Sequence, residues 1–404
     1  MWRVVDIRVL DESEHRLVYT LFRAALHQAP AGDDVWERVK DSFVPGRTLG
    51  GFEGRQLVGN TYSFPMPMIV PGGAAVPMAA VTRVGVRADR TRRGVLTALM
   101  REQLAAIAAA GEPVATLRAT EYPIYGRFGY GVASRGRDVE INPRRASMHP
   151  NAPGGGSIRL LDRDEFPTVL PRLYQRIDER RPGTLQRIDA WWQAILNRPD
   201  DEHPTCVAVH TGPDGDDGFV RYQAQDNPTP DDPWSLRLQV EDLHAASAEA
   251  TAALWRFVTG VDLINSVRGW LRPLDEPIEL LLDDASACRT VEVRDETWLR
   301  LVDVEAALNA RSWREADPVV IGVEDALLPA NSGGYRVTPD GVKRTDEPAQ
   351  LELTVAELGR LYLGDVPPSM LANAGRLTVR DRAALPAADT LFATGTVPWS
   401  GTFF

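Results

Sequence analysis

Cysteine is nearly absent from this sequence. The two cysteines among its 404 residues, Cys206 and Cys288, lie far apart and form no Cys-x-x-Cys pair. This spacing argues against a disulfide framework and against a thiolate metal site, and favours two reduced thiols in a cytosol. The six histidines show no paired ligand spacing, which argues against a zinc site. We therefore expect no metal.

Long apolar runs are missing too. No uncharged run approaches the ~18 residues of a membrane-spanning helix. Residues 1–17 carry charges throughout, unlike a signal peptide. The Gly-x-Ser-x-Gly elbow of many hydrolases is also absent. We expect a cytoplasmic protein without a membrane span.

A net positive charge is lacking as well. The formal net charge is −11, and a nucleic-acid binder needs a basic face for its phosphate contacts. No nucleic-acid partner is therefore expected. Hydrophobic residues make up 44% and charged residues 25%, as in globular proteins. A chain of 404 residues exceeds one ordinary core, so two or three domains are expected.

Composition indicates two places where the chain could divide. Residues 143–157 are rich in Pro, Gly, Asn and Ser and show no apolar period, which is typical of a linker. A second, weaker seam falls around residues 285–295. The segment after it mixes strand-like and helical patterns, and we expect an α+β lobe there.

The segments before and after the first seam share an order of elements. The first has strands at 56–64 and 79–86, a basic turn at 87–94, a helix ending at Gly111 and a strand at 113–120. Strand, turn, helix, strand implies a parallel crossover. The middle segment repeats this order, with a hairpin at 206–225, a strand at 235–243, a helix at 248–261 and a strand at 264–272. Its turn, 241–249, is acidic, so we expect a duplicated fold whose second copy has lost an anion site.

The basic turn of the first copy has the composition of a phosphate site. Arg92, Arg93 and Gly94 stand directly after a strand and at the start of a helix, where free N–H groups and the helix dipole attract anions. The turn is neither a Walker motif nor a Gly-x-Gly-x-x-Gly fingerprint. The alternative is an ordinary basic helix start, which the dipole disfavours.

This turn and a later motif together resemble a known family. The pattern V-x-V-x-x-x-x-x-R-R-G-V, followed by a helix, a strand and "IYGRFGYG" at 124–131, resembles the Gcn5-related N-acetyltransferase (GNAT) fold. More narrowly, the whole chain is similar to the Eis (enhanced intracellular survival) aminoglycoside acetyltransferases. The resemblance implies a multidomain α/β (α+β) protein that forms a homohexamer. Its domains would be a catalytic GNAT domain at 1–145, a degenerate GNAT-like domain at 146–288 and a sterol-carrier-protein-like lobe at 289–404.

The resemblance also implies an acetyl-CoA site. Val84, Gly85 and Val86 would hold the pantetheine by backbone hydrogen bonds, and Thr120 and Glu121 would line the gap to the next strand. Thr91 stands where family members usually carry Arg or Gln, which implies weaker phosphate binding. The residues around the pyrophosphate would be Arg92, Arg93, Gly94, Val95, Leu96 and Thr97.

Two residues are candidates for proton transfer. A phenol can donate a proton to the thiolate that leaves after transfer, because thiols have a pKa near ~8.5 and phenols near ~10. Tyr125 matches the family's proton donor, with the glycines of its turn letting the backbone approach the ligand. Tyr122 and Tyr130 are expected to pack. By resemblance, the α-carboxylate of Phe404 is the base, its pKa raised by the aromatic burial of the chain end.

Three residues bear on the substrate, which is expected to be a primary amine of an aminoglycoside-like, lysine or polyamine molecule. Trp36 matches a tryptophan of the family's substrate groove, with a core helix residue as the alternative. Arg83 replaces an aromatic beside the thioester, and Phe403 replaces an acidic residue. Both changes make the site less favourable for polycations. The rival hypothesis is a lipid- or acyl-binding protein in which the acetyltransferase domains are only scaffold.

Overall fold

The computed structural model describes residues 5–197, 203–230 and 232–404, which fold into two compact units. Of the described residues, unit 1 contains 5–134, 181–197 and 297–404, and unit 2 contains 135–180, 203–230 and 232–296. Strands β8 (Gly131–Ile141) and β14 (Cys288–Leu301) run from one unit into the other. Each unit is therefore built from separate stretches of chain.

The N-terminal part of unit 1 is a twisted sheet. Its strands follow the order β1-β2-β3-β6-β7-β14, and β6 and β7 run parallel, as the predicted crossover requires. A short hairpin of β4 (Met68–Ile69) and β5 (Ala75–Val76) precedes β6. The strands of the sheet are β1 (Asp6–Val9), β2 (Thr48–Glu53), β3 (Gln56–Pro65), β6 (Met78–Val86) and β7 (Val114–Leu117).

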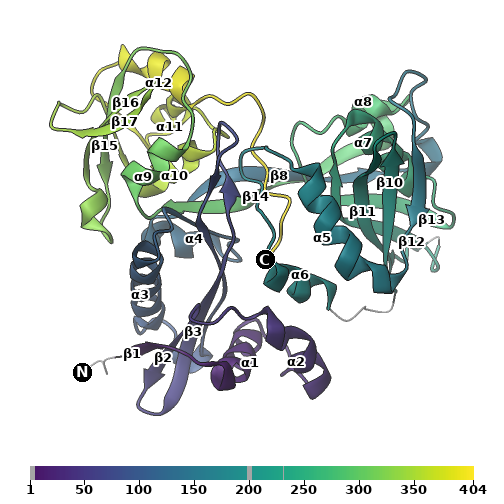
Figure 1. Ribbon diagram of the computed structural model, residues 1–404, viewed down its shortest axis with the longest axis horizontal. Coiled ribbons are helices and arrows are strands. Elements are labelled where there is room, and N and C mark those ends of the chain that lie inside the picture. Colours follow the sequence, from purple (N-terminus) through teal and green to yellow (C-terminus); the bar gives the residue numbers. More distant parts are fainter. Residues whose placement is uncertain (1–4, 198–202, 231) are drawn as a thin grey trace. The chain divides into compact units, whose positions relative to one another are not determined.

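Helices cover both faces of this sheet. Helix α1 (His15–Ala25) passes so close to Gly85 that a Cβ there would lie 3.1 Å from Leu21. On the opposite face lies α3 (Val95–Ala109), and a Cβ atom added to Gly59 would lie only 2.8 Å from the side chain of Val95 in this helix. Glycine thus allows one helix to approach from each side, and Figure 1 shows α1 and α3 flanking the strands. The predicted helix ending near Gly111 is confirmed.

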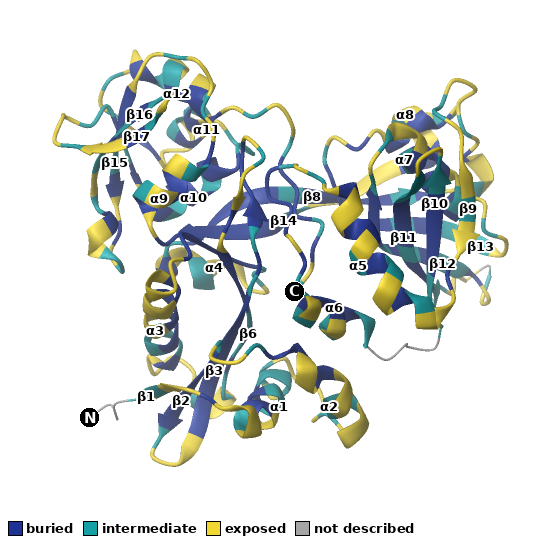
Figure 2. Ribbon diagram, in the orientation of Figure 1, coloured by how far each residue is buried: buried dark blue, intermediate teal, exposed yellow. Residues whose placement is uncertain are grey.

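The last part of unit 1 forms the expected α+β lobe. Its sheet has the order β17-β16-β15-β18-β19, with buried apolar residues on its strands (Figure 2). The strands are β15 (Val319–Glu324), β16 (Gly333–Thr338), β17 (Gly341–Thr345), β18 (Leu351–Thr354) and β19 (Thr378–Val379). The helices are α9 (Val304–Ala310), α10 (Val355–Tyr362), α11 (Pro368–Asn373) and α12 (Ala384–Phe392).

Unit 2 repeats the crossover of the first sheet. Its strands have the order β8-β13-β12-β11-β10-β9, and β12 and β13 are parallel on either side of α7 in the chain. The strands are β9 (Ser157–Leu160), β10 (Thr205–Gly212), β11 (Gly215–Asp226), β12 (Leu236–Ala245) and β13 (Ile264–Arg272). The helices are α5 (Phe166–Ile177), α7 (Ala248–Thr259) and α8 (Ile278–Leu281).

The expected seam around residues 285–295 stays a prediction, and it lies beside the division between Glu296 and Thr297, where the chain passes from unit 2 to unit 1. A short 3₁₀ turn, Ala285–Ala287, leads directly into the long strand β14. The side chains of residues 289–293 are exposed, and their backbone is extended. The predicted domain boundaries at 145 and 288 stay predictions. In the described part of the chain, no helix is long and apolar enough to cross a membrane.

Candidate active site

The parallel strands β6 and β7 separate at their C-terminal ends. Their paired residues end at Val81 and Leu117, while β6 continues to Val86. On its other side, β6 shifts register against β3, and Arg83 adopts a positive φ of 50° at this bulge. Bulges bend a strand and redirect its side chains, and they are frequent beside active sites. Val84 and Gly85 therefore lie where β6 has lost its β7 neighbour.

The start of helix α3 is open to an anion. Its N-cap residue, Gly94, has φ 84° and no side chain to cap the helix. A Cβ atom added to Gly94 would have no atom of any described residue beyond its two chain neighbours within 4 Å, so the space beside it is open. The first turn contains no acidic residue, and the N–H groups of the first turn have no intrahelical partner. Arg92, with φ 60°, and Arg93 are exposed beside it. These features suit a polyphosphate such as the pyrophosphate of acetyl-CoA.

Tyr125 lies in the same apolar cluster as this part of the sheet and helix. It ends the short helix α4 (Tyr122–Tyr125), and its half-buried side chain packs in one cluster with Val84 and Leu96. Its ring meets that of Tyr130 edge-on, with centroids 6.2 Å apart. Burial raises the pKa of Tyr125 to about 12, so the phenol carries its proton at neutral pH.

The glycines of the tyrosine turn do not have the expected role. A Cβ on Gly129 would lie 2.8 Å from the guanidinium carbon of Arg300, and one on Gly131 only 1.9 Å from the carbonyl oxygen of Ala356. Both glycines thus make room for protein, and the expectation that they make room for ligand is wrong for them. Only Gly126, of the three, faces open space.

The two other tyrosines of the turn differ from each other. Tyr130 is fully buried, as predicted. Tyr122 is 55% exposed, although its ring still meets that of Trp298 edge-on at 5.8 Å. Thr120 and Glu121 are exposed between the end of β7 and α4, and Glu121 is the N-cap of α4. They lie at the end of the strand that leaves β6, where the sequence predicted them.

The C-terminal tail reaches this end of β7. Arg118, the residue after β7, donates from Nη2 to the carbonyl oxygen of Thr402 at 2.8 Å. Arg187 donates from Nη2 to the carbonyl of Gly401 at 2.7 Å, and Trp191 donates from Nε1 to that of Phe403 at 2.8 Å. The carbonyls of three consecutive residues before Phe404 are therefore fixed.

Sequence reasoning missed these three donors. Arg187 and Trp191 lie within the predicted second domain, yet residues 181–197 belong to unit 1. The backbone N–H of Trp399 donates to Pro182 at 2.9 Å, which joins the tail to the same stretch. No local pattern marks these residues, because their partners are more than 200 positions away.

The chain end is held differently from the expectation. The ring of Phe403 is 40% exposed and lies 5.3 Å from the guanidinium of Arg118, so it does not bury the terminus. Phe404 itself is half-buried. Hydrogen bonds to the backbone, more than aromatic packing, fix the tail. The expected burial by two aromatic side chains is therefore wrong for Phe403.

Arg83 and Trp36 meet at one aromatic ring. The guanidinium of Arg83 lies 4.0 Å from the ring centroid of Phe43 and donates to Ser42 Oγ at 2.6 Å. The half-buried ring of Trp36, on helix α2 (Asp33–Val39), lies 6.1 Å from Phe43. Helix α6 (Asp189–Leu196), which carries Trp191, packs against α2. These contacts place both candidates in one cluster beside the helix that holds the tail.

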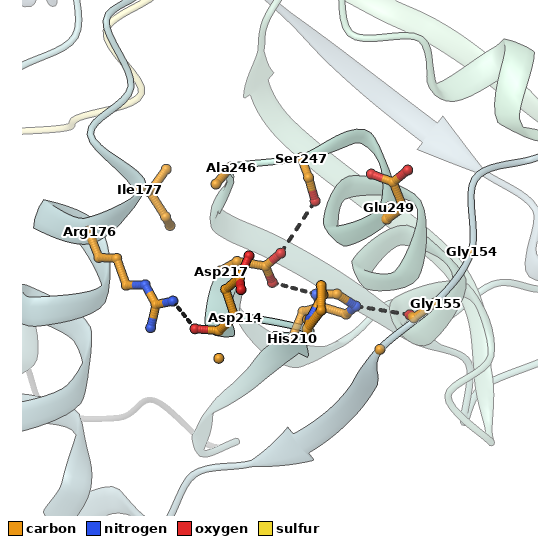
Figure 3. A pocket seen from close by; sticks show the side chains of 14 residues that line it. Gly154, Gly155, Arg176, Ile177, His210, Asp214, Asp217, Ala246, Ser247 and Glu249 are labelled. Atoms are coloured by element: carbon orange, nitrogen blue, oxygen red, sulfur yellow. Dashed lines mark hydrogen bonds and ion pairs between the residues drawn. The ribbon is translucent and has the colours of Figure 1, made fainter.

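Unit 2 has a cavity of about 540 Å³ at its own strand-to-helix turn (Figure 3). Its lining includes residues 154–156 and the buried His210, whose Nδ1 lies 2.5 Å from Asp217 and Nε2 3.0 Å from the carbonyl of Gly155. Burial alone would lower the pKa of His210. Its hydrogen bonds to Gly155 and Asp217 and the nearby carboxylates outweigh that effect and raise the pKa above its ordinary value.

The start of α7 contrasts with that of α3. Ser247 caps α7 by accepting from the N–H of Ala250 at 3.1 Å, and Glu249 lies in the first turn. The Ser247 hydroxyl thus already accepts from one of the N–H groups that a bound anion would use. These features support the view that the second copy lost its anion site, which stays a prediction. Among residues 5–197, 203–230 and 232–404, no three His, Cys, Asp or Glu residues gather as a metal site.

Comparisons with known proteins agree with this arrangement. Acetyltransferase (GNAT) domain families match residues 6–133 and 183–301, and a Sterol carrier protein domain family matches residues 304–401. The crystal structure of Eis1 from Mycobacterium abscessus aligns with a TM-score of 0.89 at 40% identity, covering 99% of this chain and 100% of that one.

Two curated relatives extend the match. The chain is 36% identical to an uncharacterized N-acetyltransferase of Streptomyces avermitilis, over 98% of each chain. It is 33% identical to N-acetyltransferase Eis of Mycobacterium tuberculosis, over 85% of each chain.

The matched families make this chain a GNAT acetyltransferase, with tandem acetyltransferase domains followed by a sterol-carrier-protein-like domain. The chain belongs to the Eis family of N-acetyltransferases. The predicted family and fold class are therefore confirmed. GNAT acetyltransferases take the acetyl group from acetyl-CoA. The rival hypothesis of a lipid carrier with scaffold domains is set aside.

Proposed function

We propose that this enzyme transfers the acetyl group of acetyl-CoA to a primary amine of a small molecule by direct attack. The observation that supports this most is the meeting of three features at the end of β7. These are the fixed C-terminal tail, the tyrosine turn and, across the gap, strand β6 with the open start of α3. The acetyl thioester supplies the activated acyl group.

The acetyl-CoA site would follow β6 into α3. Backbone groups of Val84, Gly85 and Val86 are suited to pantetheine, because β6 has no β7 neighbour beyond Val81. The N–H groups of residues 95–97 and the exposed Arg92 and Arg93 are suited to the pyrophosphate. Thr120 and Glu121 would border the gap from β7.

Two protons must move during the transfer. The incoming ammonium would give one to the carboxylate of Phe404, whose position is set by the hydrogen bonds of Arg118, Arg187 and Trp191. The amine nitrogen then attacks the thioester carbonyl and the carbon–sulfur bond breaks. Tyr125 would donate its phenolic proton to the leaving thiolate. With a pKa of about 12, Tyr125 holds that proton until the thiolate forms.

The substrate site would favour amines of low positive charge over more highly charged ones. Arg83 and Arg118 bring positive charge to the aromatic cluster and to the tail, and Phe403 supplies no carboxylate. Trp36 would contribute an aromatic wall. Lysine-type amines and polyamines are therefore candidates alongside aminoglycosides, with the more highly charged molecules at a disadvantage. A homohexameric assembly stays an expectation from the family resemblance.

The test is release of the CoA thiol from acetyl-CoA across a panel of aminoglycosides, polyamines and lysine peptides. The native-ended chain is compared with one carrying a short C-terminal extension, which would displace the Phe404 carboxylate. We expect turnover with the native end and none with the extension. Equal turnover would reject the role of Phe404, and no turnover with any amine would reject the proposed substrate class.

The acid is tested separately. Tyr125→Phe keeps the ring and removes the proton, and kcat should fall about 100-fold, within the usual range for general acid catalysis. Tyr362→Phe is the matched control, because it removes a buried hydroxyl that bonds the carbonyl of Ala307 at 2.8 Å in the C-terminal lobe. Unchanged kcat in Tyr125→Phe would mean that another group protonates the thiolate.

A further inference from the structure

A buried ion pair lies behind the tyrosine turn. Nη2 of Arg300, on β14, is 2.6 Å from Oδ2 of Asp325, and their side chains are 0% and 2% exposed. Asp325 follows β15 in the C-terminal lobe. It also accepts from Asn331 Nδ2 at 2.8 Å and from the N–H groups of Leu327 and Leu328 at 3.1 Å. The carboxylate is therefore rigidly held, and it fixes the guanidinium in turn.

The guanidinium lies directly against the turn. A Cβ on Gly129 would come within 2.8 Å of both Cζ and Nη1 of Arg300, and the φ of Gly129 is 83°. Among the described residues, Nε and Nη1 of Arg300 have no hydrogen-bond partner. The contact of Nη2 with Asp325 therefore holds the guanidinium. The backbone at Gly129 thus packs against the planar guanidinium of Arg300, and Asp325 of the C-terminal lobe holds this guanidinium in place.

Gly129 is close to the proposed acid through the backbone. The N–H of Tyr130 donates to the carbonyl of Tyr125 at 3.3 Å and closes the turn, and their rings pack edge-on. Tyr130 is fully buried, and the charge of Arg300 acts on its hydroxyl. A shift of Arg300 would therefore move Tyr130, and with it Tyr125.

Helix α10 of the same lobe fixes the other end of the turn. The carbonyl oxygen of Ala356 would lie 1.9 Å from a Cβ on Gly131, and the carbonyl of Leu299 would lie 2.5 Å from one on Gly359. Backbone meets backbone at both places. The C-terminal lobe therefore contacts the turn at Gly131 through α10 and at Gly129 through Arg300.

We propose that Arg300, held by Asp325, is a positioning residue for Tyr125, and that the sterol-carrier-like lobe thereby takes part in acetyl transfer. This inference rests on the proposed role of Tyr125. A buried ion pair adds little to stability compared with apolar residues of similar size, because desolvation offsets the attraction. Its value here is a rigid, planar support at a fixed distance from Gly129.

The experiment compares Arg300→Lys, Asp325→Asn and the uncharged double variant R300M/D325N in the full chain. Because the double variant removes both charges together and keeps a side-chain oxygen at 325 for the N–H groups of Leu327 and Leu328, it should fold even where a single variant leaves one charge unpaired. We expect kcat to fall roughly 10- to 100-fold in each, as small displacements of a catalytic group do, with the KM for acetyl-CoA unchanged. Arg272→Met is the control, because it breaks a buried pair with Glu276, 2.8 Å, in unit 2.

A second arm separates positioning from general damage. Each Arg300 variant is also made in a Tyr125→Phe chain, where no phenolic proton is left to position. If Arg300 acts through Tyr125, its replacement there lowers kcat by less than about twofold. An equal fold-loss in both backgrounds, or no loss in the native one, would overturn the inference. A Tyr125→Phe chain that keeps full activity would instead reject the acid itself, and the inference with it.

Discussion

The indole Nε1 of Trp191 donates a hydrogen bond to the backbone carbonyl of Phe403 at 2.8 Å. Trp191 is almost fully buried, so its indole is a fixed donor that holds the penultimate residue of the chain. Arg187 stacks on the same indole, with its guanidinium 4.4 Å from the ring. A helix from the middle of the sequence thereby fixes the position from which the terminal carboxylate projects.

Loss of this hydrogen bond should slow catalysis. Trp191→Phe leaves the Phe403 carbonyl without its donor, at a cost of about 1–3 kcal/mol that frees the chain end. We expect kcat to fall about tenfold. The control Trp255→Phe removes an indole bond to Glu276, 3.1 Å, in unit 2, and should leave kcat unchanged. Equal kcat in both variants would contradict a role for the tail.

The open start of α3 should determine the affinity for acetyl-CoA. Arg92→Gly removes a charge but suits the positive φ of 60°, so it tests electrostatics without adding strain. One lost charged contact to phosphate is worth about 1.5–3 kcal/mol, which predicts a KM for acetyl-CoA at least tenfold higher. Arg101→Ala, at an exposed position of α3, is the control. A KM that rises equally in the two variants would argue for a nonspecific charge effect.

Two glycines of the tyrosine turn should respond oppositely to alanine. Gly131→Ala forces a methyl group against the carbonyl oxygen of Ala356, and this backbone group of helix α10 cannot move away easily. The substitution should lower the free energy of unfolding by about 3 kcal/mol. Gly126→Ala places its methyl in open space at a helical φ of −56°, and should be neutral or slightly stabilising. Urea unfolding measures both, and comparable losses would show that the approach of α10 is looser than described.

The stability of unit 2 should decline as the pH rises above about 6.5, the unfolded pKa of histidine. His210 faces an acceptor at each ring nitrogen, which favours its doubly protonated form, and its folded pKa is raised. The contribution is full below the unfolded pKa of about 6.5 and is lost as pH rises through the higher folded value. His210→Gln should abolish this dependence. Thermal unfolding of both chains from about pH 5.5 to 8.5 tests it, and parallel curves would contradict the prediction.

The local sequence is enough for the elements that have a pattern of their own. Apolar spacing of three and four residues predicts α3, and the apolar, valine-rich run at 79–86 predicts β6. Side chains within one element report its period directly. The basic turn and the tyrosine motif, each a few residues long, were sufficient to indicate the GNAT fold and the candidates Arg92 and Tyr125.

The distant segments that join at the candidate site could be identified only from the folded chain. Arg187 and Trp191 hold the tail across more than 200 positions, and no property of either residue in the sequence indicates that partner. The glycines at 129 and 131 likewise suggest ligand contact until Arg300 and α10 are seen to occupy the space. Close packing is a property of two surfaces, and the sequence near a residue describes only one of them.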